Sequence, residues 1–452
     1  MPDLCALSAL EMASLVQQRT ISPVELVQAH LDRIATVEPL ISAFQVVRSD
    51  AVLKEAAALS KRADLADLPL AGVPVAIKDN VAVAGEPTRM GSAATSPDRV
   101  AADDKLVTRL RAAGCVVIGK TQLPELAIWP FTEPAAFGPT RNPWDRRRTP
   151  GGSTGGGAAA LVSGMAALAL GSDGGGSIRI PAACCGAFGF KPGRGLVPIA
   201  GGRKEHWHGL TEFGPIARTV ADAALMLDLL SNQPGYRDPR PLEQPIRIAF
   251  SDKHPLPGAK ASPTVRDAMD GLAAALRNTG HSLVNESPRY PLTLGLRFNR
   301  RWLSGIAQDA ADLDLAAVEP RTARMAKLGK FLSRRTKPAS ADPFGRRMAG
   351  WFDDYDALIT PTLTKEADLI GAWDGAGWVK TMLGVANQIY TPPWNIAGLP
   401  AASIPFGHDD DGLPIGVQLV GPAGSEPRLL SLAAQIEELR PWPRLAPDVH
   451  AA

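Results

Sequence analysis

The sequence predicts an α/β protein in which helices alternate with short apolar strands. A helical pattern at 106–113 leads into an apolar run at 115–118, which has the composition of a buried parallel strand. Residues 73–78 have the apolar spacing of a strand, and the C-terminal part adds strands at 402–405 and 415–420. A helix followed by an apolar strand is the order found in α/β sheets.

Two helices are expected near the N-terminus, because each begins with a capping box. Ser8 and Glu11 form the first box, and Ser22 and Glu25 form the second, with Pro23 at the first helical position. The remaining predicted elements follow in chain order: a helix at 49–61, the strand ending at Lys78, the helix and strand at 106–118, a buried helix at 158–169, a helix beginning at 178 and interrupted by Pro181, a strand at 355–361, the two C-terminal strands and a helix at 426–439.

Composition excludes several classes of function. The chain has 452 residues, 45% of them hydrophobic and 21% charged, and a formal net charge of +2. This composition fits a globular protein with a sizeable core, and the small net charge argues against nucleic-acid binding driven by overall charge. The longest apolar run, 158–170, is shorter than the about 20 residues that span a bilayer. We therefore expect a protein that binds neither nucleic acid nor membrane.

The cysteines and the N-terminus indicate the compartment. Cys5, Cys115, Cys184 and Cys185 lack the spacing of metal ligands, and adjacent cysteines do not readily bridge each other, so free thiols are expected. The N-terminus has no basic segment before an apolar run, which argues against a signal peptide. The expected location is cytoplasmic.

Two glycine-rich segments, each containing a serine, carry the chemical signal. The first is 150–157 with Ser153, and the second is 171–181 with Ser177. A phosphate-binding loop would need a Lys-Ser or Lys-Thr pair after its last glycine, and neither segment has one. The glycine spacing of a dinucleotide-binding motif directly after a strand is also missing. Nucleotide binding is therefore disfavoured.

The second segment predicts a nucleophile on a tight turn. Glycine neighbours leave a serine hydroxyl unshielded and let consecutive backbone N–H groups converge on one point. Such a ring of donors can stabilise the oxyanion that forms when a serine attacks a carbonyl carbon. The predicted nucleophile is Ser177, and the predicted oxyanion hole consists of the N–H groups of Gly174, Gly175, Gly176 and Ser177.

A serine nucleophile needs a base. None of the seven histidines lies in a motif typical of a Ser-His-Asp enzyme. His206 and His208 form a close pair, but no third metal ligand is suggested, so a loop pair is the simpler interpretation. Lys78 follows an apolar strand, and burial lowers the pKa of a lysine until it can act as a neutral base. An ordinary surface lysine is the alternative interpretation.

Lys78, Ser153 and Ser177, in this order and with these surroundings, resemble the amidase signature family. The resemblance runs almost throughout 149–192 and is weakest from about 200 to 350. With five further matching segments the resemblance covers nearly the whole chain: 72–80, 113–121, 142–143, 356–361 and 398–401.

The resemblance implies a large, mixed, twisted β-sheet sandwiched between layers of α-helices, in a single domain over 1–452. About 60–200 would form the core with the catalytic residues, about 200–350 a variable region that covers the substrate, and about 351–440 the C-terminal part of the core. Arginine and lysine residues are frequent at 297–337. A solvated helical face and a mobile cover over the active site are the two interpretations of this run.

The resemblance also implies a Ser-cisSer-Lys triad with a cis peptide bond between Gly152 and Ser153. Neutral Lys78 would take a proton from Ser153 while Ser153 takes one from Ser177. Ser177 would attack the carbonyl carbon, and Ser153 would then protonate the leaving nitrogen. Lys78, Ser153 and Ser177 are thus the implied catalytic residues.

Other residues are expected behind the triad. Asp173 and Arg179 would pair and fix the nucleophile turn, and a plain structural ion pair is an overlapping interpretation. Thr154, the residue after Ser153, would support the triad. Four positions depart from the common pattern of the family. Thr154 and Gly157 stand where serine is frequent, and Gln122 stands where asparagine is usual. Gly174 replaces a bulkier residue, and a looser oxyanion turn is expected there.

The expected activity is hydrolysis of a carbon–nitrogen acyl bond other than a peptide bond, through an acyl-enzyme on Ser177. Small-molecule amides are the implied substrates, with anilides, esters and carbamates (urethanes) as further candidates. No cofactor and no metal are expected, and the chain would act as a monomer or homodimer. Two alternatives are a glutaminase subunit of a tRNA-dependent amidotransferase and a non-catalytic binding protein on the same fold.

The substrate pocket is expected to be largely apolar. Asp79, Asn80 and the loop at 195–207 would border it. Six aromatic residues are candidates for its lining, with burial in the core as the alternative: Trp129, Phe131, Trp144, Trp302, Trp351 and Trp394.

Overall fold

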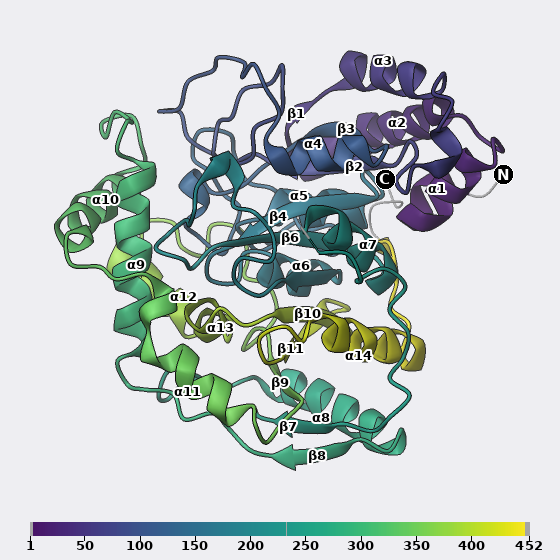
Figure 1. Ribbon diagram of the computed structural model, residues 1–452. Coiled ribbons are helices and arrows are strands. Elements are labelled where there is room, and N and C mark those ends of the chain that lie inside the picture. Colours follow the sequence, from purple (N-terminus) through teal and green to yellow (C-terminus); the bar gives the residue numbers. More distant parts are fainter. Residues whose placement is uncertain (1–2, 232, 448–452) are drawn as a thin grey trace.

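The computed structural model describes residues 3–231 and 233–447. Within these residues, eleven strands form one sheet in the order β1-β3-β2-β4-β6-β5-β10-β11-β9-β7-β8 (Figure 1). Their bounds are β1 (Phe44–Val47), β2 (Pro74–Lys78), β3 (Val116–Thr121), β4 (Leu168–Asp173), β5 (Phe188–Lys191), β6 (Glu212–Ala217), β7 (Arg247–Phe250), β8 (Ser282–Asn285), β9 (Ala357–Pro361), β10 (Ala401–His408) and β11 (Pro414–Val420).

The sheet is mixed. β3, β2 and β4 are parallel to one another, as are β9, β7 and β8, and antiparallel pairs join these two groups through β6, β5, β10 and β11. The helices that accompany it are α1 (Ala9–Gln17), α2 (Pro23–Ile41), α3 (Ser49–Leu59), α4 (Lys105–Ala112), α5 (Gly155–Val162), α6 (Arg179–Cys185), α7 (Val220–Leu230), α8 (Pro263–Asn278), α9 (Leu294–Asp309), α10 (Pro320–Ser333), α11 (Pro343–Trp351), α12 (Trp378–Ala386), α13 (Pro392–Ala397) and α14 (Glu426–Leu439).

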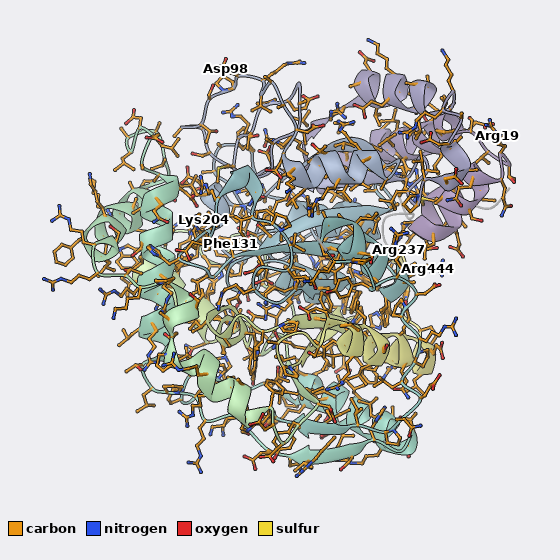
Figure 2. The ribbon with its side chains drawn as sticks, in the orientation of Figure 1. Arg19, Asp98, Phe131, Lys204, Arg237 and Arg444 are labelled. Carbon is orange, nitrogen blue, oxygen red and sulfur yellow. The ribbon has the colours of Figure 1, made fainter. Side chains whose placement is uncertain are left out.

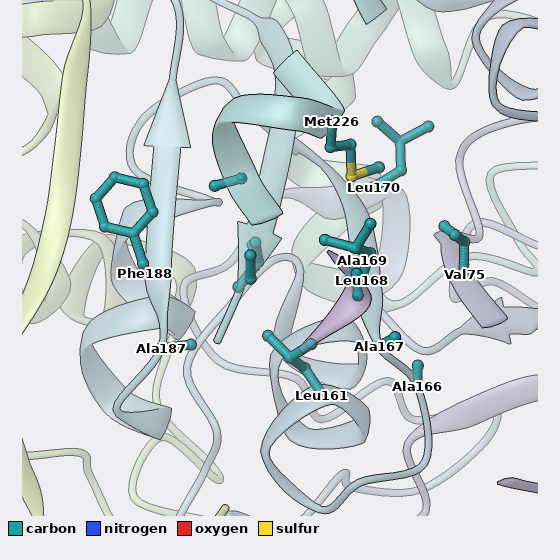
Figure 3. Close-up of a cluster of buried hydrophobic side chains, with 14 of the residues drawn as sticks. Val75, Leu161, Ala166, Ala167, Leu168, Ala169, Leu170, Ala187, Phe188 and Met226 are labelled. Carbon is teal, nitrogen blue, oxygen red and sulfur yellow. The ribbon is translucent and has the colours of Figure 1, made fainter. Parts of the chain in front are cut away.

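The main core lies where helices pack on the two faces of the parallel strands. Figure 3 shows Leu161 of α5 and Met226 of α7 on opposite sides of β4. Every residue of β2 and β4 is buried, which explains why these strands have apolar residues without a clean alternation. The predicted layered α/β fold is confirmed.

Several local predictions are confirmed. Both N-terminal capping boxes form. In each box the serine side chain accepts the backbone N–H of the glutamate, and the glutamate side chain accepts the backbone N–H of the serine. The predicted helix at 426–439 coincides with α14. The predicted strands at 73–78, 115–118 and 355–361 correspond to β2, β3 and β9, with small shifts of their ends.

Two predictions about helices are wrong. The run at 158–169 is not one helix, because α5 ends at Val162, Gly164 turns the chain with a positive φ of 74°, and β4 begins at Leu168. A run buried on all sides gives no periodicity by which a strand can be told from a helix. Pro181 does not interrupt α6, since it lies in the first turn, where a backbone N–H has no partner within the helix.

The region from about 200 to 350 supplies α9 and α10, which pack on each other at the left edge of Figure 1. Side chains of α10 with nitrogen tips extend into solvent at the same edge of Figure 2, and Arg324, Lys327 and Lys330 are exposed. The solvated-face interpretation therefore describes α10, whereas α9 lies against the cavity described below. Among the described residues, no helix is long and apolar enough to cross a membrane.

Candidate active site

Lys78 enters the interior at the end of β2, the parallel strand between β3 and β4. Its side chain is fully buried. The Nζ atom lies 2.8 Å from Ser153 Oγ, 2.9 Å from Ser172 Oγ and 3.3 Å from the carbonyl oxygen of Ser172. Lys78 is therefore held by hydroxyl and carbonyl oxygens.

These surroundings decide the charge of Lys78. Burial disfavours the ammonium form and lowers the pKa of Lys78 to about 7, although the carboxylate of Asp173 acts in the opposite direction. A lysine with this pKa is largely neutral at slightly alkaline pH, and its free electron pair can then accept a proton from a neighbouring hydroxyl.

Ser153 lies just before α5, next to Lys78, and is almost fully buried. The peptide bond between Gly152 and Ser153 is cis. A β-carbon added at Gly152 would lie 2.8 Å from the backbone of Trp129 and Phe131, so no side chain fits there. The N–H of Thr154 donates to the carbonyl oxygen of Ser177 over 3.1 Å, which ties the two serine segments together.

Ser177 lies on the turn between β4 and α6 and lines the cavity described below. Ser177 is partly exposed, unlike Lys78 and Ser153. The carboxylate of Asp173 shapes the turn by accepting the N–H of Gly176 at 2.7 Å and that of Ile178 at 3.2 Å. Gly176 has a φ of 130°, which favours glycine over any residue with a β-carbon.

The predicted pair of Asp173 and Arg179 is present and fully buried. Arg179 Nε and Nη2 lie 2.9 Å and 2.8 Å from the two carboxylate oxygens. Burial alone would raise the pKa of Asp173, but the guanidinium outweighs it and holds this pKa well below its usual range. Arg179 also donates to Gln418, Asn395 and the backbone of Thr391, so β11 and α13 fix the nucleophile turn.

The turn contains backbone N–H groups that have no partner within the protein. The N–H of Gly176 is used by Asp173. Within the described chain, the N–H groups of Gly174, Gly175 and Ser177 have no protein acceptor. Of the four donors predicted for the oxyanion hole, three thus have no partner in the protein, and the residues of two of these, Gly175 and Ser177, line the cavity. The fourth, the N–H of Gly176, is directed at a carboxylate.

An indole ring packs on this turn. A β-carbon added at Gly174 would lie 2.7 Å from the ring of Trp207, and one at Gly305 of α9 would lie 2.3 Å from it. Trp207 has a φ of 49°, in the left-handed region that few non-glycine residues adopt. Asp309 at the end of α9 accepts from Trp207 Nε1 at 2.8 Å and bonds to His206 Nε2 at 2.9 Å, which holds the loop in this conformation.

The cavity beside Ser177 has a volume of about 280 Å³. It is mostly apolar, as predicted, and its walls come from segments far apart in the sequence. The residues that line it include Ile128, Trp129, Ser177, Ile180, Trp207, Leu256, Leu294, Phe298, Asn299, Trp302, Met382, Val385, Ile389 and Ile396.

The predicted lining is correct in part. Trp129 and Trp302 line the cavity and meet edge to face, with ring centroids 5.7 Å apart. Trp207, at the end of the predicted bordering loop, lines it too. Four other aromatic residues lie elsewhere: Phe131 is stacked behind Trp129, Trp144 packs on His408, Trp351 packs on Tyr355, and Trp394 is buried in the core.

Asp79 and Asn80, which are predicted to border the pocket, follow Lys78 in the chain and do not line the cavity. Asp79 is fully buried and pairs with Lys120 over 2.7 Å. Asn80 Nδ2 donates to Ser172 Oγ at 3.0 Å, and so holds the hydroxyl that contacts Lys78. In residues 3–231 and 233–447, no three His, Cys, Asp or Glu side chains are grouped as metal ligands would be.

Sequence reasoning missed four residues that hold the site. Ser172 lies next to Asp173 in the glycine-rich segment, so its position could have drawn attention to it. Thr391, Asn395 and Gln418 come from a distant part of the chain and carry no local signal. Their role becomes visible only where α13 and β11 meet the nucleophile turn.

Comparisons with known proteins match most of the chain to one family. A family model described as Amidase matches residues 25–430. The chain is 43% identical to a Mycobacterium tuberculosis protein named amidase AmiB2, covering 99% of both chains, and 33% identical to the acylamidase of Rhodococcus erythropolis, covering 96% of both. The solved structure of 6-aminohexanoate cyclic dimer hydrolase with its substrate matches with a TM-score of 0.87, at 30% identity over 99% of both chains.

Proposed function

This chain belongs to the amidase family and hydrolyses carbon–nitrogen amide bonds, and from that premise we propose that Ser177 is the nucleophile, Ser153 the proton relay and Lys78 the base. One observation carries the proposal: Lys78 Nζ lies 2.8 Å from Ser153 Oγ in a fully buried setting that lowers the lysine pKa to about 7. The partly exposed Ser177 on the cavity wall supports its role as the residue that meets the substrate.

The proposed reaction begins with a proton transfer through Ser153. Neutral Lys78 accepts the Ser153 hydroxyl proton, Ser153 accepts the Ser177 hydroxyl proton, and Ser177 Oγ bonds to the carbonyl carbon. When the tetrahedral intermediate collapses, the carbon–nitrogen bond breaks and the proton returns from Lys78 through Ser153 to the leaving nitrogen. Water then attacks the acyl-enzyme by the same route and releases the acid.

We propose that the oxyanion is held by the free N–H groups of Gly174, Gly175 and Ser177. The N–H of Gly176, which the sequence assigns to the same role, is bonded to Asp173 at 2.7 Å and is better suited to fixing the turn. Each donor directed at the oxyanion contributes about 10²–10³ in rate in enzymes of this kind.

The proposed substrates are small-molecule amides, with anilides, esters and carbamates as further candidates. The name of the Rhodococcus acylamidase supports activity on acylated amines. A glutaminase subunit is less well supported, because no charged side chain among the described residues lines the cavity to bind the ammonium and carboxylate of glutamine. Turnover of aryl amides and of glutamine by the isolated chain would separate the two.

A serine-directed fluorophosphonate tests the nucleophile. We expect labelling at Ser177, located by peptide mass spectrometry, and loss of both labelling and amide turnover in Ser177→Ala. Ser163→Ala, a buried serine at the far end of α5, is the matched control and should retain both. Turnover by a folded Ser177→Ala variant would disprove the assignment.

A further inference from the structure

The cavity has no means of compensating a charge on its ligand. Among the described residues that line it, none is acidic, basic or a histidine. Apart from the indole rings, its polar side chains are the Ser177 hydroxyl and the Asn299 amide. A charged group entering this space would lose its water without gaining an ionic partner, which is strongly unfavourable.

Several charged side chains near the cavity are already paired with one another. Arg297 and Arg301 of α9 both bond to Asp342, each over 3.0 Å. Asp309 is paired with His206 and Arg203 and does not line the cavity. These charged groups therefore have ionic partners that do not line the cavity.

The apolar surface continues out of the cavity. Leu292, Leu296 and Leu383 line its mouth and are 84%, 72% and 55% exposed. An apolar chain that is longer than the cavity would thus remain in contact with leucine side chains as it leaves.

We propose that the cavity binds an uncharged apolar group of the substrate, and that the enzyme selects amides carrying such a group against amides of equal length that end in an ammonium or a carboxylate. This inference rests on the proposed function. The apolar group belongs to either the acyl or the amine half of the amide, because both halves leave the carbonyl beside Ser177.

Two matched series of substrates test the inference. The acyl series consists of the 4-nitroanilides of hexanoic, 6-aminohexanoic and adipic acids, and the amine series of N-hexylacetamide, N-(6-aminohexyl)acetamide and 6-acetamidohexanoate. We expect the neutral compound to exceed both charged ones in kcat/KM by about 100-fold or more in the series whose variable group occupies the cavity. Equal or higher kcat/KM for the charged compounds in both series would overturn the inference.

A charge introduced into the wall provides a second test. Met382 lies on α12, is partly exposed and lines the cavity. Met382→Glu should raise kcat/KM for the ammonium compound at least about tenfold relative to Met382→Gln, which has nearly the same shape without the charge. No difference between these variants would also count against the inference.

Fluorophosphonate labelling separates the two possible failures. If Ser177 is labelled and the charged compounds are preferred, the substrate class is wrong while the nucleophile stands. If Ser177 is not labelled and no compound is hydrolysed, the proposed function fails and the inference fails with it.

Discussion

Two buried lysines at the ends of neighbouring parallel strands have different partners. Lys120, on β3, has the carboxylate of Asp79 at 2.7 Å. Lys78, on β2, has the oxygen atoms of Ser153 and Ser172 around it. Burial lowers the pKa of both lysines. At Lys120 the contacting carboxylate of Asp79 opposes this effect, whereas the contacts of Lys78 are uncharged oxygen atoms and Asp173 opposes the effect without a direct contact. This difference suits Lys78 to act as a base.

The pKa of Lys78 predicts the pH dependence of the reaction. Under the proposed mechanism the neutral amine is the active form, so kcat/KM should rise about tenfold per pH unit below pH 7 and level off above about pH 7. Lys78→Ala should lower the rate by several orders of magnitude, since the base and the relay act as a unit. Initial rates measured from pH 5.5 to 9 would reveal the profile, and a flat profile across neutrality would exclude Lys78 as the base.

At the scale of elements, α9 and the loop before β6 complete the nucleophile turn. The sequence predicts a looser turn at Gly174, but the indole of Trp207 fills the space that a side chain there would take. Trp207 fits because Gly305 leaves room on α9 and Asp309 holds its Nε1. A glycine in one segment is thus matched to a tryptophan in another.

This match can be tested by a double substitution. In Gly174→Ala the new β-carbon meets the Trp207 ring at 2.7 Å, so we expect kcat/KM to fall by about 10- to 100-fold. Adding Trp207→Ala removes the clash and should restore part of this loss. Gly175→Ala is the control, because its β-carbon would meet Phe298 at 2.8 Å and Trp207→Ala should not rescue it. Equal rescue of both would refute the specific contact.

At the scale of the whole molecule, the site depends on the continuity of the sheet. β4 supplies Asp173 and β11 supplies Gln418, and Arg179 joins them across the strands between. We propose that the chain unfolds as a single domain, and a single calorimetric transition is expected. Two transitions, or a stable fragment from limited proteolysis, would contradict this.

The burial of Lys78, the proposed base, should lower the stability of the folded protein. The pKa of Lys78 is about 7 when folded, against about 10.4 in an unfolded chain. Between these values the unfolded chain binds more protons, so the free energy of unfolding should rise with pH from about 7 to about 10, and this contribution is least favourable below pH 7.

Substitution of the two lysines should therefore have opposite effects. Lys78→Met should raise the free energy of unfolding by about 1–3 kcal/mol at pH 7 while abolishing activity. Lys120→Met should lower it by about 3–5 kcal/mol, because Asp79 would be left buried and unpaired. Urea denaturation of both variants and the parent measures this, and a destabilised Lys78→Met would argue against the lowered pKa.

The sequence by itself determined the features that depend on nearby residues. The capping serines that precede the first two α-helices, the strand ending at Lys78 and the glycine-rich turn at Ser177 have local signals, and each lies where it was predicted. The strands β5 to β8 were not predicted, because they are short and their apolar pattern is weak.

Only the tertiary structure decided how these parts meet. The order of the strands, the support of Arg179 by Asn395 and Gln418, and the position of Trp207 over Gly174 join residues from about 30 to 240 positions apart. Backbone propensities and hydrophobic periodicity act over a few residues, whereas burial and its effect on the pKa of Lys78 depend on everything packed around the side chain. The sequence therefore leads to a proposal for the reacting groups, whereas their burial and the uncharged walls of the cavity beside Ser177 depend on the folded structure.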